Sequence, residues 1–213
     1  MQKREFNAGE QHLRAAIAGF DMEGRATYEY LSLRPGVDIT VLDERDVDVP
    51  SGVTKITGPD VFSSKLDFDQ VWRTPGLSPF KLQTDGEVTS GTIAFFNLCP
   101  APIIGVTGTK GKGTTASLIA AILEESKKTV HLVGNIGQPA LSVLPDIKPE
   151  DIVVFELSSF QLWDIKSSPQ VAVVLMIEPD HLDVHKDLAD YLQAKSNIAR
   201  WQGPDDKVIY LSE

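Results

Sequence analysis

A glycine-rich stretch in the middle of the chain carries the residue types best suited to phosphate chemistry. It reads Gly-Val-Thr-Gly-Thr-Lys-Gly-Lys-Gly-Thr-Thr (105–115) and stands between an apolar run and an amphipathic stretch. Glycines let the backbone fold so that its N–H groups point at phosphate oxygens, and a lysine such as Lys112 reaches the β- and γ-phosphates. The strict phosphate-loop pattern places a glycine six residues before that lysine, where this chain has Val106. A bare strand-to-helix turn is the alternative, but the strand, lysine and threonines together favour phosphate binding.

A carboxylate follows the next strongly apolar run, Ile-Val-Val-Phe (152–155). Glu156 would then lie at the carboxyl end of a buried parallel strand, which is the edge of such a sheet where ligands bind. Mg²⁺ in nucleotide sites takes one or two carboxylates together with phosphate oxygens. Alone, Glu156 fits a rim glutamate facing water equally well; beside a phosphate loop, the metal role is favoured.

Acid and imidazole side chains follow a third apolar run (171–177) in the segment Glu-Pro-Asp-His-Leu-Asp-Val-His (178–185). They suggest a second metal or a substrate contact. Tyr191 and Lys195 are four residues apart and share a face of the helix expected at 188–201. A single histidine is more often a satisfied surface group, and an isolated helix lysine is usually solvated, so this pattern by itself is weak.

The first half of the chain has fainter signals. Gly-Phe-Asp-Met-Glu-Gly (19–24) is a poor dinucleotide fingerprint, because Asp21 takes the middle glycine position. Asp43 ends the second apolar run, 24 residues after Gly19, near where an acidic residue would meet a ribose or a base. An ordinary α/β packing unit explains these features about equally well.

The elements that must position these residues alternate along the chain. Apolar runs predict strands at 13–18, 39–42, 68–72, 103–106, 130–133, 152–155, 171–177 and 208–210, and amphipathic spacing predicts helices at 25–33, 92–98, 114–126 and 188–201. Gly19 and Gly24 are expected to bracket a turn. The apolar face of the third helix is expected to carry Leu118, Ile119, Ile122 and Leu123. Near-continuous Val/Ile runs separated by helices indicate buried parallel strands, so the fold class is α/β in two units that split near residue 100.

Composition excludes several classes of protein. The 213 residues are 42% apolar and 23% charged, as in ordinary soluble globular chains. A net charge of −10 argues against a large nucleic-acid footprint. The single cysteine, Cys99, suits a reducing cytosol, and the longest apolar run has seven residues, far short of a membrane span. The N-terminus has no apolar core of a secretory signal, so a soluble cytoplasmic chain is expected.

Five segments together resemble the Mur ligases, ATP-dependent enzymes that add amino acids to the UDP-linked peptidoglycan precursor. They are Gly-Val-Thr-Gly-Thr-Lys-Gly-Lys (105–112), Gly-Asn-Ile-Gly (134–137), Glu-Leu-Ser-Ser-Phe-Gln-Leu (156–162), Asp-His-Leu-Asp (180–183) and Tyr-Leu-Gln-Ala-Lys (191–195). The form of the third segment, with Val-Leu-Asp-Glu-Arg (41–45) and Thr-Pro-Gly (74–76), resembles the family branch that adds D-glutamate to UDP-N-acetylmuramoyl-L-alanine. The resemblance implies a Rossmann-like UDP-substrate domain (1–99) and a phosphate-loop ATPase-type central domain (100–213), incomplete here. It places the chain in cell-wall synthesis, on which cell shape and division depend.

The resemblance also implies roles for individual residues. ATP would contact Gly108, Thr109, Lys110, Gly111, Lys112, Gly113 and Thr114. Mg²⁺ would be held by Thr114, Glu156, His181 and a Lys195 that is carbamylated by CO₂. The catalytic set would be Lys112, Glu156, His181 and Lys195. The UDP-linked substrate would contact Asp43, Glu44, Arg45, Thr74, Gly76, Asn135, Ser159 and His181.

The chain departs from the family pattern at three positions. Gly113 stands where a Thr or Ser usually supplies a Mg²⁺-binding hydroxyl, which Thr114 would have to replace. Met176 stands where an Asn is common, and Asp21 would repel a diphosphate. The chain stops at Glu213, before the third domain of family members, so we expect it alone to be an inactive fragment. Two alternatives stay open: another Mur or folylpolyglutamate-type ligase, and a degenerate, non-catalytic nucleotide-binding module.

Overall fold

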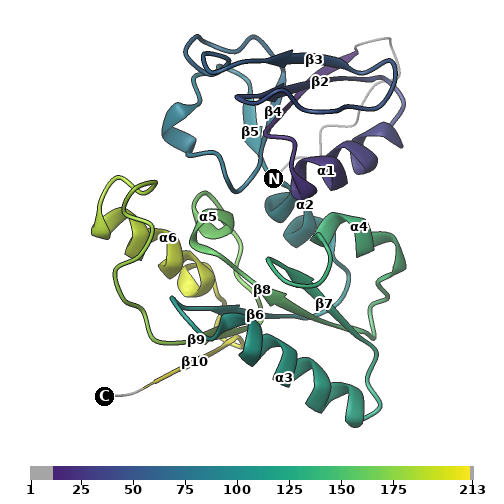
Figure 1. Ribbon diagram of the computed structural model, residues 1–213. Coiled ribbons are helices and arrows are strands. Elements are labelled where there is room, and N and C mark those ends of the chain that lie inside the picture. Colours follow the sequence, from purple (N-terminus) through teal and green to yellow (C-terminus); the bar gives the residue numbers. More distant parts are fainter. Residues whose placement is uncertain (1–11, 212–213) are drawn as a thin grey trace.

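The structure is a computed structural model that describes residues 12–211, and it contains two five-stranded sheets (Figure 1). All strand pairings in both sheets are parallel. Helices alternate with the strands along the chain. The predicted α/β class, with a Rossmann-like sheet followed by a second parallel sheet, is confirmed.

The first sheet has the strand order β3-β2-β1-β4-β5, which is the Rossmann order. Its strands are β1 (Leu13–Ala18), β2 (Val37–Asp43), β3 (Thr54–Thr57), β4 (Gln70–Arg73) and β5 (Glu87–Thr89). β1, β2 and β4 lie where the apolar runs predicted them. β3 and β5 were not predicted, because β3 is a largely exposed edge strand with polar residues and β5 has only three residues.

The helix after β1 begins earlier than predicted. α1 (Met22–Ser32) takes in Gly24, which was expected in a turn. A Cβ at Gly24 would lie 2.2 Å from the carbonyl oxygen of Gly19, so the glycine lets the first turn of α1 pack against the loop after β1. A short 3₁₀ helix, η1 (Pro79–Lys81), follows β4 along the chain.

The second sheet has the order β10-β9-β6-β8-β7. Its strands are β6 (Ile103–Thr107), β7 (Val130–Gly134), β8 (Ile152–Glu156), β9 (Val171–Val174) and β10 (Lys207–Tyr210). The other elements of this half are α3 (Lys112–Glu125), α4 (Ala140–Val143), η2 (Leu144–Asp146), α5 (Ser159–Leu162) and α6 (Leu188–Arg200). β6 lies between β8 and β9, and the chain crosses from one side of β6 to the other. The carboxyl end of β6 is therefore the point in this sheet where a ligand is expected.

Two expectations about the second sheet were wrong in detail. The run 171–177 ends as a strand at Val174, after which the chain turns toward the loop that follows β6, with Thr109 N–H donating to the Met176 carbonyl at 2.9 Å. On α3, Leu118 and Ile122 are 59% and 58% exposed, whereas Ile119 and Leu123 are partly buried against the cluster that contains Ala116 and Ala120. The helix therefore packs on the sheet through its alanines together with Ile119 and Leu123, and only half of the predicted apolar face is buried.

The two halves share one hydrophobic core. α2 (Gly91–Leu98) lies between the sheets (Figure 1), and its Phe95 packs edge-on against Phe155 of β8 with ring centroids 5.4 Å apart. Phe96 stacks on the same ring at 5.8 Å. Ile17 of β1 and Trp72 of β4 belong to the same buried cluster. The loops at the carboxyl ends of both sheets are therefore held in a fixed relation to each other.

Candidate functional site

The loop between β6 and α3 has the backbone that phosphate binding requires. Gly108 has φ = 151°, and a Cβ there would lie 2.7 Å from the Cβ of Leu175. Only glycine fits that position without displacing the loop. α3 begins at Lys112, so its N-terminal N–H groups and the positive end of the helix dipole lie next to the loop. The predicted ATP-contacting residues 108–114 therefore form one continuous turn at the end of β6.

The side chains of this loop differ in burial and in the contacts that they make. Thr109 is buried, and its hydroxyl donates to the Glu178 carbonyl at 2.9 Å and lies 2.8 Å from the Tyr191 hydroxyl. Lys112 Nζ donates to the Thr109 carbonyl at 3.0 Å, which folds the ammonium back toward the loop. Lys110 and Thr114 are exposed. The Thr109 side chain thus anchors the loop internally, and the Lys112 ammonium is held against the main chain of the loop.

Three charged groups gather beneath the loop without forming a conventional ion pair. Glu156 is 2% exposed, and its Oε2 atom has no hydrogen-bond partner. Burial raises the pKa of Glu156, and the nearby Lys112 and Lys195 partly offset that rise. Lys195 comes from α6, is 3% exposed, and donates from Nζ to the Gly108 carbonyl at 2.8 Å. The structure therefore brings together three of the four predicted catalytic residues.

Burial also changes the titration of Lys195. Desolvation and the like charge of Lys112 lower its pKa to about 8, against smaller opposing effects of Asp180 and Glu156. A lysine with this pKa is about one-tenth neutral at pH 7, far more than an exposed lysine. The neutral amine is the form that reacts with CO₂, so the environment of Lys195 fits the carbamylation that the sequence suggested.

His181 lies at the side of this cluster. It has a positive φ of 53°, its Nε2 is 3.6 Å from an Asp180 oxygen, and its ring centroid is 5.0 Å from that of Phe160. The side chain is half exposed. Its place in a metal shell stays a prediction, because no contact joins it to Glu156 or Lys195.

A divalent cation fits the chemistry of this cluster. Within residues 12–211 there is no group of three or more His, Cys, Asp or Glu side chains able to hold a metal by themselves. The orphaned, buried oxygen of Glu156 is nevertheless a hard ligand with nothing to bind, and a carbamate on Lys195 would add a second. Such a site would be completed by ligand phosphates and a modified lysine.

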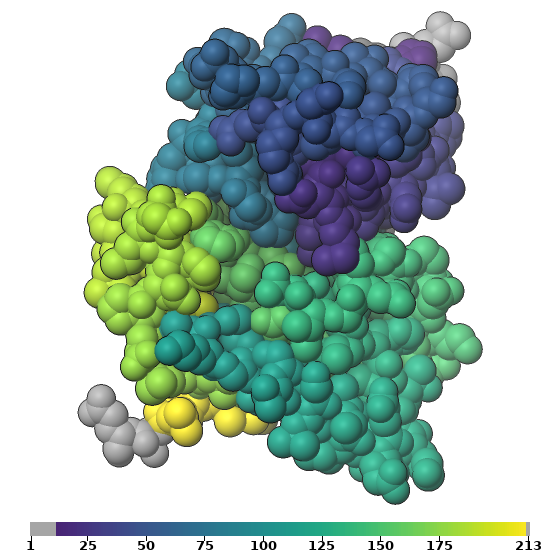
Figure 2. All heavy atoms as spheres, in the orientation of Figure 1, coloured from purple at the N-terminus to yellow at the C-terminus, as the bar shows by residue number. Residues whose placement is uncertain are grey.

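A larger cleft lies beside the first sheet. Its volume is about 840 Å³, and Figure 2 shows the surface hollowed where the two halves of the chain meet. It is lined by five of the predicted substrate-contacting residues: Asp43, Glu44, Arg45, Thr74 and Gly76. Asp183 and Lys186 line it from the second half. Asn135 lies in an adjoining cavity of about 150 Å³ that shares Thr74 and Gly76 with the cleft.

The three acids that the first half contributes to this cleft are each paired with a base. Arg45 donates to Asp21 at 2.9 Å and to Asp43 at 3.2 Å, and Lys81 pairs with Glu44 at 2.6 Å. Burial alone would raise the pKa of Asp43, but hydrogen bonds from Arg45 and from the Phe20 N–H hold it below its usual value. Asp21 was expected to repel a diphosphate; its charge is offset by Arg45, a pairing that the sequence did not indicate.

Ser159 does not line either cavity. It is 2% exposed, and its hydroxyl lies 3.0 Å from Nε2 of His185. His185 Nδ1 lies 2.9 Å from Asp190, and the imidazole stacks on Phe160. A substrate contact for Ser159 therefore stays a prediction, and the structure shows it in an internal hydrogen-bond chain that holds α5 against α6.

Sequence reasoning missed several residues around the two cavities. Lys81 and Lys186 line the cleft, and Gln161 donates to Glu23 at 3.2 Å across the two halves. Burial raises the pKa of Glu23. The spacing of Gln161 three residues after Ser158 is a capping-box pattern and could have been recognised. Nothing in the sequence indicates the other contacts, because their partners are far apart along the chain.

The fold and loop define a class: an α/β protein whose second sheet carries a glycine-rich loop with a backbone suited to phosphates and whose first sheet borders a cleft. Residues 106–213 match the Mur ligase middle domain. The chain belongs to the Mur ligase family.

Curated relatives sharpen this assignment. The chain is 40% identical over 220 aligned residues to the UDP-N-acetylmuramoylalanine–D-glutamate ligase of Acetivibrio thermocellus, covering 96% of this chain and 47% of that protein. It is 37% identical to the protein of the same name from Symbiobacterium thermophilum, covering 92% and 46%. The chain thus spans about half the length of the curated relatives it matches.

A solved structure supports the fold. The UDP-N-acetylmuramate–alanine ligase MurC of Thermotoga maritima is similar with a TM-score of 0.50 and 18% identity, over 95% of this chain and 50% of that one. Across residues 12–211, the helices are all too short or too polar to cross a bilayer.

Proposed function

We propose that this chain is the substrate- and nucleotide-binding part of an ATP-dependent ligase that joins D-glutamate to UDP-N-acetylmuramoyl-L-alanine. The observation that carries the proposal is the cluster of Lys112, Glu156 and Lys195 beneath the phosphate loop. The names of the curated relatives supply the two substrates. The domain limits 1–99 and 100–213, and a cytoplasmic location suited to the single Cys99, belong to the same proposal.

In the proposed reaction, the carboxylate of the UDP-linked substrate attacks the γ-phosphorus of ATP, and ADP leaves. The amine of D-glutamate then attacks the carbonyl of the resulting acyl phosphate, and inorganic phosphate and a proton leave as the amide forms. Phosphoryl transfer of this kind depends mainly on positioning and on neutralising charge. The N–H groups of the loop and Lys112 would hold the phosphates, and the 840 Å³ cleft would hold the uridine and diphosphate.

Glu156 and carbamylated Lys195 would hold Mg²⁺, with Thr114 and His181 as further ligands. Bound Mg²⁺ would neutralise phosphate charge and orient the reacting oxygens. Formation of the carbamate consumes a neutral lysine and CO₂ and releases a proton, so one cation is replaced by an anion. That change would leave the Lys112 ammonium next to Glu156 without the competing positive charge of Lys195.

The two alternative functions make different use of the same residues. A folylpolyglutamate-type ligase would share the phosphate loop, but the paired acids and bases in the first cleft fit a polar, hydrogen-bonding ligand such as uridine diphosphate. A non-catalytic binding module would have no use for the buried, unpartnered Glu156, because an unpaired buried carboxylate lowers stability.

The test is a calorimetric titration of the chain with four ligands in parallel. We expect UDP-N-acetylmuramoyl-L-alanine to bind more tightly than folate or NAD, and ADP to bind more tightly with Mg²⁺ than without it. Equal or better binding of NAD or folate would contradict the assignment of the cleft. Binding of ADP that does not respond to Mg²⁺ would contradict the assignment of Glu156.

A second measurement addresses Lys195. A ¹³C-bicarbonate NMR signal from the carbamate is expected in the presence of Mg²⁺ and is expected to vanish in Lys195→Ala. Lys207→Ala, which removes an exposed lysine on β10, is the matched control. The same signal in the Lys195→Ala protein would remove Lys195 from the metal shell.

A further inference from the structure

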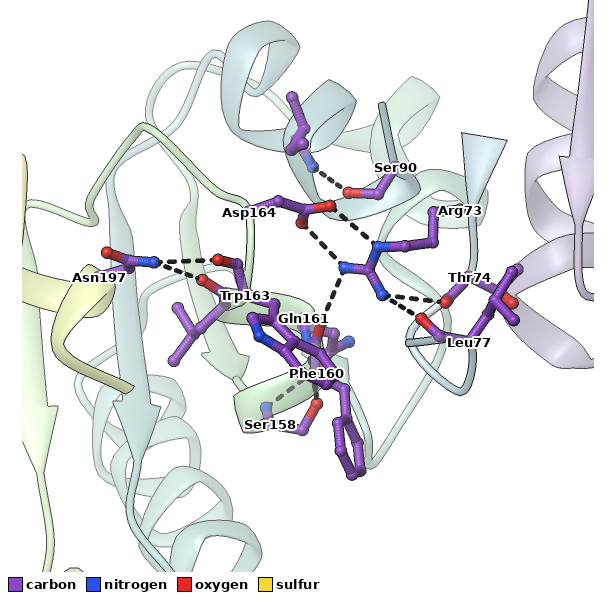
Figure 3. Close-up of polar contacts among 12 residues, drawn as sticks. Arg73, Thr74, Leu77, Ser90, Ser158, Phe160, Gln161, Trp163, Asp164 and Asn197 are labelled. Atoms are coloured by element: carbon purple, nitrogen blue, oxygen red, sulfur yellow. Dashed lines mark hydrogen bonds and ion pairs between the residues drawn. The ribbon is translucent and has the colours of Figure 1, made fainter. Parts of the chain in front are cut away.

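The largest fully buried side chain of the described structure belongs to Arg73, the last residue of β4. Its side chain is 1% exposed and lies where the first half of the chain meets the second (Figure 3). Neither the phosphate loop nor the charged residues of the cleft require a buried guanidinium at this point. Burying such a charge is costly unless all of its donors are satisfied.

All five N–H donors of Arg73 are engaged. Nε and Nη2 donate to the two oxygens of Asp164, each at 2.9 Å, and Nη2 also donates to the Phe160 carbonyl at 3.0 Å. Nη1 donates to the carbonyls of Thr74 and Leu77 at 3.2 and 2.8 Å. Figure 3 shows the guanidinium between these two groups of acceptors. A lysine could not reproduce this planar fork.

The acceptors on one side belong to the loop that follows β4. Thr74, Gly76 and Leu77 all line the 840 Å³ cleft, and the Thr74 hydroxyl donates to the Ala18 carbonyl at 2.8 Å. The two hydrogen bonds that Arg73 Nη1 donates to the Thr74 and Leu77 carbonyls also hold this loop in place. The position of the cleft wall therefore depends on where the guanidinium is fixed.

The acceptors on the other side belong to the second half of the chain. Phe160 contacts the ring of His181, and it stacks on His185 with centroids 5.3 Å apart. Trp163, next to Asp164, contacts Phe80 of η1 with centroids 5.8 Å apart. Arg73 thus joins the wall of the first cleft to Phe160, whose ring contacts that of the predicted site residue His181.

We propose that Arg73 is a positioning residue that sets the loop 74–77 against the 160–164 segment, so that uridine nucleotide binding depends on a residue outside the cleft. Asp164 is its partner in this role. Only the identity of the ligand rests on the proposed function. Because the phosphate loop, Glu156 and Lys195 make none of these contacts, adenine nucleotide binding depends on Arg73 only indirectly, through Phe160 and His181, and is affected less than uridine nucleotide binding.

The test compares Arg73→Lys and Arg73→Ala with the unaltered chain. UDP and Mg²⁺·ADP are titrated separately by calorimetry. Hydrogen bonds to a buried charge are strong, so we expect UDP affinity to fall about tenfold or more in both variants, with a clearly smaller change in Mg²⁺·ADP affinity. Guanidinium chloride at low millimolar concentration should restore UDP binding to Arg73→Ala but not to Arg73→Lys, whose side chain fills the space. Sodium chloride at equal ionic strength should not.

Arg14→Lys is the matched control. Arg14 also pairs with two aspartates, Asp67 and Asp69, but its side chain is 48% exposed and both partners belong to the first half of the chain. The UDP affinity of the Arg14→Lys protein should equal that of the unaltered chain. Asp164→Asn is a second, milder variant that keeps the shape of the partner, and it should weaken UDP binding in the same direction.

Three results would overturn the proposal. One is UDP affinity in folded Arg73→Lys and Asp164→Asn equal to that of the unaltered chain. Another is an equal loss of UDP and Mg²⁺·ADP binding, which would show general destabilisation. The third applies if the unaltered chain binds no uridine nucleotide, a result that contradicts the proposed function but not the positioning role. Hydrogen exchange in Arg73→Lys is then expected to become faster in residues 74–77 and 160–164 together. Unchanged exchange in these residues would overturn the positioning role.

Discussion

The two ligand regions lie at corresponding edges of two parallel sheets, but they differ in how their charges are arranged. In the cleft beside the first sheet, Asp21 and Asp43 share Arg45, and Glu44 has Lys81. Beneath the phosphate loop of the second sheet, Glu156 has an orphaned oxygen, and Lys195 and Lys112 donate to main-chain carbonyls.

The difference indicates which site is formed before its ligand arrives. A cleft whose charges already satisfy one another can hold its shape alone, and a ligand must compete with existing pairs. A cluster with an unpaired buried carboxylate and a lysine of lowered pKa would be stabilised by the cation, phosphates and carbamate of the proposed site. We therefore expect substitutions in the second region to change binding strongly and those in the first to change it weakly.

Glu156→Gln should give the largest effect. The amide keeps the shape of the side chain but removes the charge that would hold Mg²⁺, so the Mg²⁺-dependent part of ADP affinity should fall about 100-fold, or about 2.8 kcal/mol. The free energy of unfolding without ligand should not fall, because burial disfavours the ionised form of Glu156. Calorimetry and urea unfolding measure the two quantities. A variant that binds Mg²⁺·ADP normally would show that the orphaned oxygen is not a ligand.

Lys195 should give a pH-dependent stability in the ligand-free, CO₂-free protein. Its pKa is about 8 in the folded state against 10.5 for an ordinary lysine, so the folded state binds fewer protons between those values. The free energy of unfolding should therefore rise with pH across this window, by up to about 3 kcal/mol, and the full penalty should be present below pH 8. Urea unfolding of Lys195→Met, subtracted from that of the unaltered chain, isolates this rise.

Lys207→Met is the control for that series, since it removes an exposed lysine and should leave the rise intact. A difference curve between Lys195→Met and the unaltered chain that stays flat from pH 7 to pH 10 would mean that Lys195 is not desolvated in solution.

Two glycine substitutions test the geometry of the phosphate loop. Gly108→Ala should lower the free energy of unfolding by about 2 kcal/mol and weaken ADP binding, because φ is 151° and the new Cβ would lie 2.7 Å from Leu175. Gly113→Ala should raise stability by about 0.5–1 kcal/mol, because the helix there leaves 3.5 Å to the nearest atom of Ile136. Urea unfolding of both proteins decides; equal effects would contradict the loop conformation.

Asp21→Asn should give the smallest effect. The Asp21–Arg45 pair is exposed on both sides, so stability should change by less than about 1 kcal/mol. Removal of one negative charge from the cleft should raise UDP affinity about threefold at low salt, and the gain should shrink in 0.5 M salt. Asp67→Asn, an exposed acid paired with Arg14, is the control and should leave UDP affinity unchanged. A weaker affinity in Asp21→Asn would show that Asp21 itself contacts the ligand.

Sequence alone predicted the second half of the molecule better than the first. The phosphate loop and Glu156 directly follow strongly apolar strands, so their place at the edge of the sheet follows from local patterns. Lys195 lies on a helix and stood out only through the family resemblance. β3 is polar and exposed and β5 is very short, so neither has a hydrophobic period to detect. On α3, the apolar pattern pointed to Leu118, Ile119, Ile122 and Leu123, of which Ile119 and Leu123 pack against the buried cluster beside Ala116 and Ala120, while Leu118 and Ile122 are exposed.

Contacts between distant segments were beyond sequence reasoning. Arg73 and Asp164 are 91 residues apart, and Gln161 and Glu23 are 138 apart. Asp21 and Arg45 were each recognised, but their pairing depends on the fold of the first sheet. His185 was noted only as part of an acidic and imidazole-rich segment, and its hydrogen bonds to Ser159 and Asp190 appear only once α5 and α6 are packed together.

The position of α2 has a consequence for how the chain comes apart. Phe95 and Phe96 pack on Phe155, and the same buried cluster continues into the first sheet through Ile17 and Trp72. Opening either sheet would expose apolar surface of the other, so the stability of one half includes a contribution from its neighbour. The two sheets are expected to unfold in a single cooperative transition. Replacing either half with that of another protein would require a new apolar surface on which α2 can pack.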